Sequence, residues 1–164
     1  MSFYLKLLGS GLLLLSALLA SSEYSSYADR RLLHYSGVVA LLSHAEGVIS
    51  RFLSSGGEMW REFKNDELEK IGLLPLLREG ETLLSAFQKC EAKLYLSVEA
   101  KEKIKEFLST VGKEYRAGAV SSFAELRQSL ESEMKSEKDR LEKQVKIVRA
   151  LLLGGALAFV IFIM

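Results

Sequence analysis

The 164-residue chain contains one cysteine and one proline, and it has no excess of charge of either sign. A single cysteine, Cys90, cannot form an intramolecular disulfide or supply a zinc site built from several thiolates. With one proline and few runs of alternating β-branched residues, most of the chain can form helices. The 22 basic and 21 acidic side chains nearly cancel, which argues against nucleic acid as a partner because phosphates attract a basic surface.

Motifs that carry common chemistries are also missing. Ser55-Gly56-Gly57 is not followed by the lysine and hydroxyl residue of a phosphate-binding loop. The histidines His34 and His44 are ten residues apart, so they do not share a helix face as metal ligands at i,i+4 do. We therefore predict that the chain is not an enzyme and has no catalytic, cofactor-binding or metal-binding residues and no cofactor.

Some acidic and single residues could still carry chemistry, and each has a simpler structural interpretation. The carboxylate pairs Glu67/Glu69 and Glu131/Glu133 lie in charge-rich helical segments, which favours a solvated face over paired acid–base catalysis. Cys90 falls on a helical stripe of apolar residues, which predicts a buried thiol. Trp60, with Met59 and Phe63 beside it, is predicted to pack in the core rather than to form a docking patch.

Two apolar segments flank a charged middle. Phe3–Ala20 is 18 residues long, about 27 Å as a helix, which is just enough to cross the hydrocarbon core of a bilayer. We predict transmembrane helices at 3–20 and 146–164, with a helical bundle at 23–145 between them. A cleaved signal peptide, with Ala20-Ser21-Ser22 as its cleavage site, is the alternative for the first segment. The second segment is short, so its span includes Lys146 and Arg149, which snorkel to the interface.

Basic residues are concentrated on the inner side of both predicted spans. Lys6 and the N-terminal amine are the only positive groups on the other side. The basic residues next to the middle segment are Arg30, Arg31, Lys135, Lys138, Arg140, Lys143, Lys146 and Arg149. Because loops rich in lysine and arginine stay in the cytoplasm, the pattern predicts that the bundle faces the cytoplasm.

The last quarter of the chain combines an amphipathic helix pattern with the second apolar segment. Ser122 and Glu125 fit a capping box, which predicts that a helix starts there. Apolar residues then recur at steps of three and four, with one interruption at Lys138: Phe123, Leu126, Leu130, Met134, Leu141, Val145 and Val148. No proline or glycine occurs before Gly154-Gly155. We predict one helix that continues from the bundle into the second span.

The middle segment contains further helical patterns. A long helix is predicted from about Ala28 to Leu53, with Gly37 and Gly47 weakening it unless another helix packs closely there, and with Ser54–Gly57 ending it. Its inward positions are Val38, Leu42, Ala45, Ile49 and Phe52. Short helices are predicted at 58–63 and 66–71, followed by a turn at 72–75 in which Pro75 is a candidate first helical residue. Two further helices are predicted, one at 80–96 and one that Ser97 caps and that runs to about residue 111. The fold class is all-α, an antiparallel helical bundle between two transmembrane helices.

The order of motifs along the chain resembles the stage III sporulation protein AB family of endospore-forming bacteria over nearly the full length. The matching stretches are Leu5-Lys6-Leu7-Leu8-Gly9, Arg31-Leu32-Leu33, Leu41-Leu42, Glu46–Ile49, Phe107–Gly112, Lys146–Leu151, Gly154-Gly155 and the aliphatic end at Met164. The chain departs from the family at Gly112–Arg116 and around Trp60–Pro75.

The resemblance implies a structural role in a channel or secretion-like complex of the mother-cell membrane around the forespore. It implies a helical domain similar to those of type II secretion and type IV pilus inner-membrane platform proteins. Its partners would be a sporulation ATPase, similar to stage III sporulation protein AA, and other stage III sporulation membrane proteins; self-association into a homo-oligomer is compatible with that role.

Two other functions are alternatives to the platform role. The alternative is a small membrane-anchored sensor or signalling protein, which stoichiometry distinguishes because a sensor usually dimerises. The third is a membrane hydrolase or metalloenzyme that uses His34, His44 and an acid, and glutamine at both histidines would test it.

Overall fold

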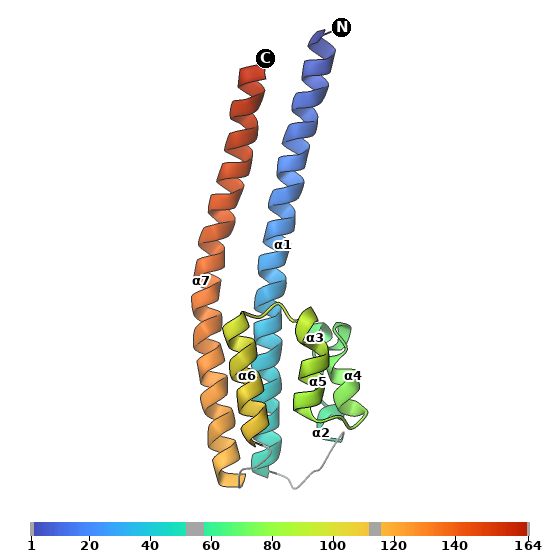
Figure 1. Ribbon diagram of the computed structural model, residues 1–164, viewed down its shortest axis with the longest axis vertical. Coiled ribbons are helices and arrows are strands. Elements are labelled where there is room, and N and C mark those ends of the chain that lie inside the picture. The colour runs from blue at the N-terminus through green and yellow to red at the C-terminus, as the bar shows by residue number, and fades with distance from the viewer. Residues whose placement is uncertain (1, 52–57, 112–115, 164) are drawn as a thin grey trace. The chain divides into compact units, whose positions relative to one another are not determined.

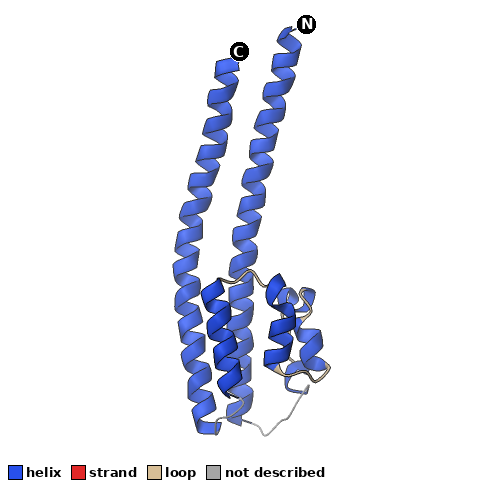
Figure 2. Cartoon of the chain, in the orientation of Figure 1, coloured by secondary structure: helices blue, strands red, loops and turns tan. Residues whose placement is uncertain are grey.

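The computed structural model describes residues 2–51, 58–111 and 116–163, and its regular structure there is entirely helical (Figures 1 and 2). The elements are α1 Ser2–Arg51, α2 Glu58–Arg61, α3 Asp66–Lys70, α4 Leu73–Arg78, α5 Leu83–Cys90, the 3-10 helix η1 Glu91–Lys93, α6 Val98–Val111 and α7 Arg116–Ile163. The predicted all-α class is confirmed.

The chain divides into two compact units. Unit 1 consists of residues 1–30 and 137–164, and unit 2 of residues 31–136. The long helices α1 and α7 each contribute residues to both units, whereas α2 to α6 belong to unit 2 alone.

Unit 2 has one apolar core. Its residues come from α1 and α7, from α6, and from the short helices between residues 58 and 93. The side chains buried most completely are Tyr35, Leu42, Leu68, Leu73, Leu74, Leu77, Leu94, Ile104 and Leu130. Each helix is apolar on one side, so burial against the others provides the stability that short helices lack in isolation.

The short helices α2 to α4 are connected by local hydrogen bonds. The side chain of Asn65 caps α3 by accepting a hydrogen bond from the Leu68 amide at 3.0 Å. Gly72, at φ +91°, turns the chain between α3 and α4, a conformation that residues with a Cβ rarely adopt. Arg78 at the end of α4 donates to the Phe63 carbonyl at 3.0 Å and to Glu69 at 2.7 Å. These contacts hold α4 against the segment that follows α2.

Unit 1 pairs the first part of α1 with the last part of α7. Most of the buried residues in this unit are small, namely Ser10, Ala17, Ser21 and Ala28 of α1 and Ala156 of α7, and Leu141 of α7 is buried with them. Tyr24 donates a hydrogen bond to Gln144 Oε1 at 3.2 Å. Small side chains allow two helix backbones to approach closely, as they do between membrane helices.

The apolar stripe predicted along the last quarter of the chain is confirmed. Phe123, Leu126, Leu130 and Leu141 are buried, and Met134 packs against the core of unit 2. The inward positions Val38, Leu42 and Ala45 of α1 are buried as predicted, whereas the side chain of Ile49, Phe52 and the predicted stop at 54–57 lie outside the described residues. The core positions predicted for Trp60 and Cys90 are confirmed, as these side chains are 5% and 3% exposed.

Several predicted boundaries are wrong. Helix α7 begins at Arg116, so Ser122 lies inside it rather than at its start, because the upstream residues extend the helix. The predicted span at 3–20 and the helix predicted from about Ala28 are one continuous helix, α1, and Tyr24 between them donates a hydrogen bond to Gln144 of α7. The predicted turn at 72–75 is too long, because α4 begins at Leu73. Pro75 is the third helical residue rather than the first, and the helix tolerates it there since the first amides of a helix need no intrahelical partner.

The helix predicted at 80–96 is also shorter. It is the eight-residue α5, capped by Thr82 Oγ1, which accepts a hydrogen bond from the Ser85 amide at 3.2 Å, and it tightens into η1 at residue 91. The cap predicted at Ser97 is confirmed, because its Oγ accepts from the Ala100 amide at 2.9 Å.

The two glycines of α1 in unit 2 differ in their surroundings. A Cβ at Gly37 would lie 3.2 Å from Asn65 Oδ1 and 3.2 Å from Leu68 Cγ, whereas a Cβ at Gly47 would meet nothing within 4 Å. Gly37→Ala would therefore push on the side chain that caps α3, and Gly47→Ala would only add helix propensity.

We expect Gly47→Ala to raise the free energy of unfolding by up to ~1 kcal/mol and Gly37→Ala to lower it by about 1 kcal/mol. Denaturant unfolding of the full chain in detergent, followed by the fluorescence of the single tryptophan, measures both variants. Equal stabilisation by the two substitutions would show that α3 does not pack closely against α1.

Candidate functional site

A partly buried polar cluster joins three helices in unit 2. Tyr35 of α1 donates a hydrogen bond to Glu133 Oε1 of α7 at 2.8 Å. Ser97, the cap of α6, donates from its Oγ to the same Glu133 oxygen at 2.5 Å and from its amide to the Tyr35 hydroxyl at 3.2 Å. Tyr35 is 1% exposed and Glu133 is 19% exposed, so the cluster extends from the core towards the surface. It fixes the register of α1, α6 and α7, because each hydrogen bond requires its own pair of positions.

Glu133 is the charged member of this cluster. Its second oxygen, Oε2, is buried without a hydrogen-bond partner among the described residues, and Lys103 Nζ lies 3.8 Å from it. Burial raises the pKa of Tyr35, the hydrogen bonds from Ser97 lower it, and the neighbouring Glu133 carboxylate raises it further. A neutral Tyr35 hydroxyl is therefore favoured because it can donate to the carboxylate.

The prediction that Glu133 lies on a solvated face is wrong. Glu131 is 42% exposed and pairs with Arg127 at 2.8 Å, but Glu133 is 19% exposed and points into the cluster. A signal was present in the sequence, because Glu133 follows Leu130 by three residues and so continues the apolar stripe.

Removing the Tyr35 hydroxyl tests the cluster. Tyr35→Phe leaves the Ser97 amide and Glu133 each with one partner fewer, so the free energy of unfolding should fall by about 1–3 kcal/mol at neutral pH. The pKa of Tyr35 in the folded chain is above its ordinary 10.0, so its stabilising effect is fully present below pH 10 and is lost as pH rises through the folded pKa.

We therefore expect stability to decline above pH 10 and the decline to be shallower in Tyr35→Phe. Cys90 adds to the alkaline decline in both proteins, because burial raises its pKa above the ordinary 9.0. Tyr95→Phe, at a side chain that is 41% exposed, is the control. If Tyr35→Phe and Tyr95→Phe gave the same pH profile in denaturant titrations, the cluster would not depend on the neutral hydroxyl.

The two histidines have separate structural partners. His34 Nδ1 accepts a hydrogen bond from the Tyr95 amide at 2.9 Å, and its Nε2 lies 3.9 Å from Glu67 Oε2. His44 Nε2 is 2.8 Å from the Met59 carbonyl oxygen, to which the ring donates, and the ring lies beside Phe63. The structure therefore does not bring His34 and His44 into one site.

Other candidate groups are also paired. Within residues 2–51, 58–111 and 116–163, no three side chains of His, Cys, Asp or Glu are arranged to hold a metal ion. Glu67 pairs with Lys70 at 2.6 Å, and Glu69 with Arg78 at 2.7 Å, so these two carboxylates do not act together.

A pocket of about 350 Å³ opens in unit 2 among Ala45, Met59, Trp60, Glu81 and Leu108. Glu81, its charged residue, is held by hydrogen bonds from Lys89 and Ser85, and the Lys89 hydrogen bond lowers its pKa. The remaining lining is mostly apolar. The pocket therefore presents no charged side chain that is not already engaged by the protein.

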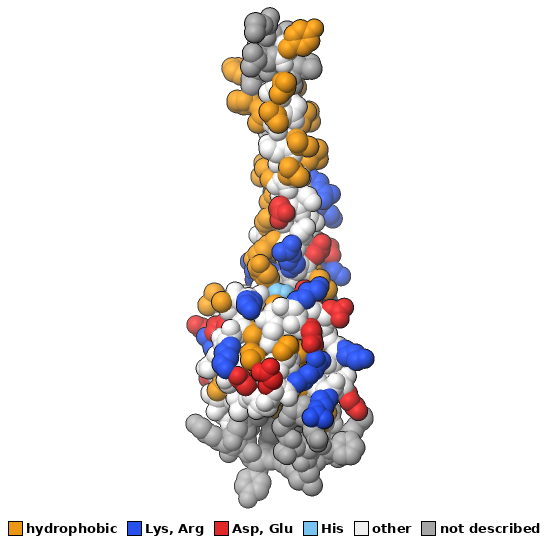
Figure 3. Space-filling view, turned by 90° about the vertical axis from the view of Figure 1, so that its right-hand side faces the viewer, with side chains coloured by type: hydrophobic (Ala, Val, Ile, Leu, Met, Phe, Trp, Pro, Cys, Tyr) orange, Lys and Arg blue, Asp and Glu red, His pale blue; other side chains and the backbone are white. Residues whose placement is uncertain are grey.

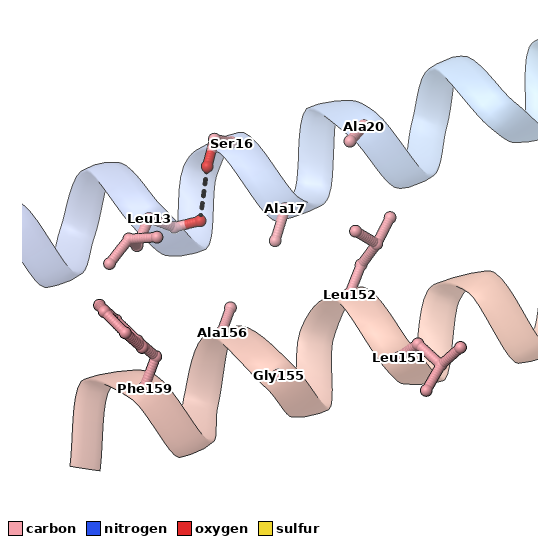
Figure 4. Close-up of a pocket in the computed structure, with 9 residues that line it drawn as sticks. All are labelled: Leu13, Ser16, Ala17, Ala20, Leu151, Leu152, Gly155, Ala156 and Phe159. Carbon is pink, nitrogen blue, oxygen red and sulfur yellow. Dashed lines mark hydrogen bonds between the residues drawn. The ribbon is translucent and has the colours of Figure 1, made fainter. Parts of the chain in front are cut away.

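Both helices of unit 1 expose large apolar side chains, and Figure 3 shows such side chains, with charged ones beside them, on the face that it presents. An apolar groove of about 540 Å³ between the two helices has the small residues Ala17, Gly155 and Ala156 in its lining (Figure 4). The exposed large side chains are Tyr4, Leu8, Leu12, Leu15, Leu18, Leu19, Tyr27, Ile147, Leu151, Leu157, Phe159, Ile161 and Phe162. Among the described residues, one helical stretch, Ser121–Phe162 of α7, is long and apolar enough to cross a membrane, with 6% of its most apolar window buried. The start of α1 is less clearly apolar, and its span at 3–20 stays a prediction.

A comparison with models of known protein families identifies the family of the chain. The family model for stage III sporulation protein AB matches residues 6–164. Searches of curated proteins and of solved structures found no match. The match includes residues of both units, from the fifth residue of α1 to the end of α7. The chain therefore belongs to the stage III sporulation protein AB family, whose name implies a role in sporulation.

Proposed function

We propose that the chain is a non-enzymatic platform or adaptor subunit of a sporulation channel or secretion-like complex. In this role it couples a cytoplasmic ATPase to membrane components during endospore formation. Family membership supports the sporulation role. Each histidine and carboxylate described above has its own structural partner within the chain. This supports a protein that binds other proteins rather than one that performs a reaction.

The observation that carries this proposal is the composition of α7. Its first part supplies Phe123, Leu126 and Leu130 to the core of unit 2. Its last part exposes Leu151, Phe159 and Ile161, whose apolar surface suits lipid. Both sets of residues belong to one unbroken helix. A displacement of the residues in the core of unit 2 can therefore be transmitted along the helix backbone to the residues that face lipid.

The proposed location is the mother-cell membrane around the forespore, with the bundle in the cytoplasm. Spans at 3–20 and 146–164 would both lie in unit 1, whose helices pair through small residues. The cytoplasmic side follows from the basic residues between Lys138 and Arg149, which precede the second span.

The proposed partners are a sporulation ATPase, similar to stage III sporulation protein AA, and other stage III sporulation membrane proteins. Unit 2 has acidic and basic side chains interspersed on its surface (Figure 3), which suits a reversible protein contact better than binding to a polyanion. An ion pair between Arg127 and Glu46, at 3.1 Å, joins α7 to α1 within this unit.

A pull-down of the tagged full chain from mildly solubilised membranes of sporulating cells tests the proposal. We expect mass spectrometry to identify a ring ATPase together with other sporulation membrane proteins, and several copies of the chain in each complex. Recovery of the chain as a dimer with a kinase or a transporter would support the sensor alternative instead. The double variant His34→Gln and His44→Gln should recover the same partners as the wild type.

A further inference from the structure

The fold of unit 2 requires the neutral form of His34. The His34 side chain is 3% exposed, and its Nδ1 accepts a hydrogen bond from the Tyr95 amide at 2.9 Å. A ring nitrogen accepts a hydrogen bond only while it carries no proton, so the hydrogen of the neutral ring is on Nε2. An imidazolium has a hydrogen on both nitrogens, and the one on Nδ1 would point at the hydrogen of the Tyr95 amide. Protonation of His34 and its hydrogen bond to Tyr95 therefore exclude each other.

The Tyr95 amide belongs to the segment 94–97, which connects η1 to α6. On either side of it, Leu94 and Leu96 are buried in the core, and the Tyr95 ring centroid is 5.2 Å from that of His34. Ser97 at the end of the segment caps α6 and belongs to the polar cluster described above. The hydrogen bond to His34 therefore fixes a segment that leads directly into the start of α6.

A carboxylate from α3 lies close to the other nitrogen of this ring. Glu67 Oε2 is 3.9 Å from His34 Nε2, so an imidazolium that lost its contact with Tyr95 would be attracted to Glu67. Lys70 weakens this attraction, because its Nζ lies 2.6 Å from the other oxygen of Glu67. Glu67 thus gives the protonated ring an alternative partner to the Tyr95 amide.

Further charged groups near the ring come from α1, η1 and α7. Arg30 and Arg31 precede His34 by four and three positions on α1, and their positive charge opposes its protonation. Lys93 of η1 donates to a backbone carbonyl oxygen at the end of α3 at 3.4 Å. Glu133 of α7 accepts hydrogen bonds within the polar cluster. Burial and the arginines favour the neutral ring, and Glu67 favours the charged one.

We propose that His34 is a pH-sensitive latch on the segment 94–97. The neutral ring holds the Tyr95 amide. Uptake of one proton from solvent on Nδ1 removes this acceptor, directs the ring to Glu67 and frees the segment that precedes α6. Imidazole in water takes up this proton at about pH 6.5, so mild acid is sufficient. Acid therefore loosens the start of α6 while the rest of unit 2 stays folded. This property does not depend on the platform role.

Amide hydrogen exchange of Tyr95 tests the latch in the full chain in detergent, with NMR signals from ¹⁵N-labelled tyrosine. The protection factor relates the observed exchange rate to that of an unstructured peptide at the same pH, which removes the direct effect of pH on exchange. We expect it to fall by about tenfold from pH 7.5 to pH 5.5, because the freed form binds one proton more than the latched form. Most carboxylates titrate at about pH 4, below this range. The Tyr35 amide, inside α1, should keep its protection.

The two histidines provide a matched pair of variants. His34→Asn places an amide oxygen where Nδ1 lies, which can accept from Tyr95 and does not titrate, so the protection factor should not change with pH. His44→Gln should keep the wild-type response. The His44 ring donates from Nε2 to the Met59 carbonyl oxygen at 2.8 Å, and it can do so in either protonation state.

A wild-type protection factor that is the same at both pH values would show that His34 is not a latch, and this result requires no variant. The proposal would also be wrong if His34→Asn kept the tenfold fall. Parallel loss of protection at Tyr35 and Tyr95 would indicate a general loss of stability in acid and would equally overturn it. The platform role is tested separately by the pull-down.

Discussion

Gln144→Pro is expected to abolish sporulation by the strain that carries it, although unit 2 should remain folded. Gln144 lies in the part of α7 that belongs to unit 1, and its side chain accepts a hydrogen bond from Tyr24. Proline in a helix interior removes one hydrogen bond and clashes with the preceding turn, at a cost of ~3 kcal/mol or more. If the platform works through an unbroken α7, a kink at this position disconnects its two parts.

Gln144→Ala is the matched control. It loses the contact with Tyr24, which contributes about 1 kcal/mol, but it keeps the helix because alanine has the highest helix propensity. Sporulation frequency and the amount of protein in the membrane fraction are measured for both strains. Gln144→Pro protein that reaches the membrane in normal amounts and still supports sporulation would contradict the mechanism.

A second, milder variant that weakens helix α7 at the same place is needed if the Gln144→Pro protein does not reach the membrane in normal amounts. The pair Gln144→Gly and Val145→Gly weakens the helix by roughly 2 kcal/mol without a steric clash, so insertion should be retained. Normal sporulation with this variant would equally count against a continuous α7 as the coupling element.

Leu77→Ala should lower the free energy of unfolding by about 2–5 kcal/mol. Leu77 is completely buried in α4, a six-residue helix whose neighbours α2 and α3 have four and five residues. Helices this short are not stable alone, so their structure depends on the shared core. A cavity at Leu77 should therefore loosen α2 to α4 before the rest of unit 2.

The fluorescence of Trp60 reports this region directly, because it is the single tryptophan and is buried in the same core. Leu76→Ala is the matched control, since its side chain is partly buried and only packs against the core. We expect Leu76→Ala to cost less than half as much in denaturant titrations. Equal costs for the two substitutions would show that Leu77 does not occupy a closely packed site.

Local sequence patterns predicted some features of the candidate site and missed others. The cap at Ser97 was predictable because its signal lies within one helical turn. The role of the same residue in the Tyr35–Ser97–Glu133 cluster was not predictable. It depends on residues 62 and 36 positions away, and no local rule relates such distant positions.

The difference between the two glycines of α1 has the same origin. Both are glycines in a long helix, and both weaken it equally by propensity. Only at Gly37 do neighbouring side chains, Asn65 and Leu68, pack so closely that a Cβ would crowd them.

The sequence by itself determined the all-α class, the apolar stripe of α7, the buried positions of Trp60 and Cys90, and membership of the family. These properties follow from periodicity, hydrophobicity and motif order, which are local or additive along the chain. The tertiary structure decided where α7 begins, that Glu133 is only partly exposed and accepts hydrogen bonds from two other helices, and that each histidine has its own partner. Those features depend on which helices meet, because burial and hydrogen bonds between helices are set by packing across long separations in sequence.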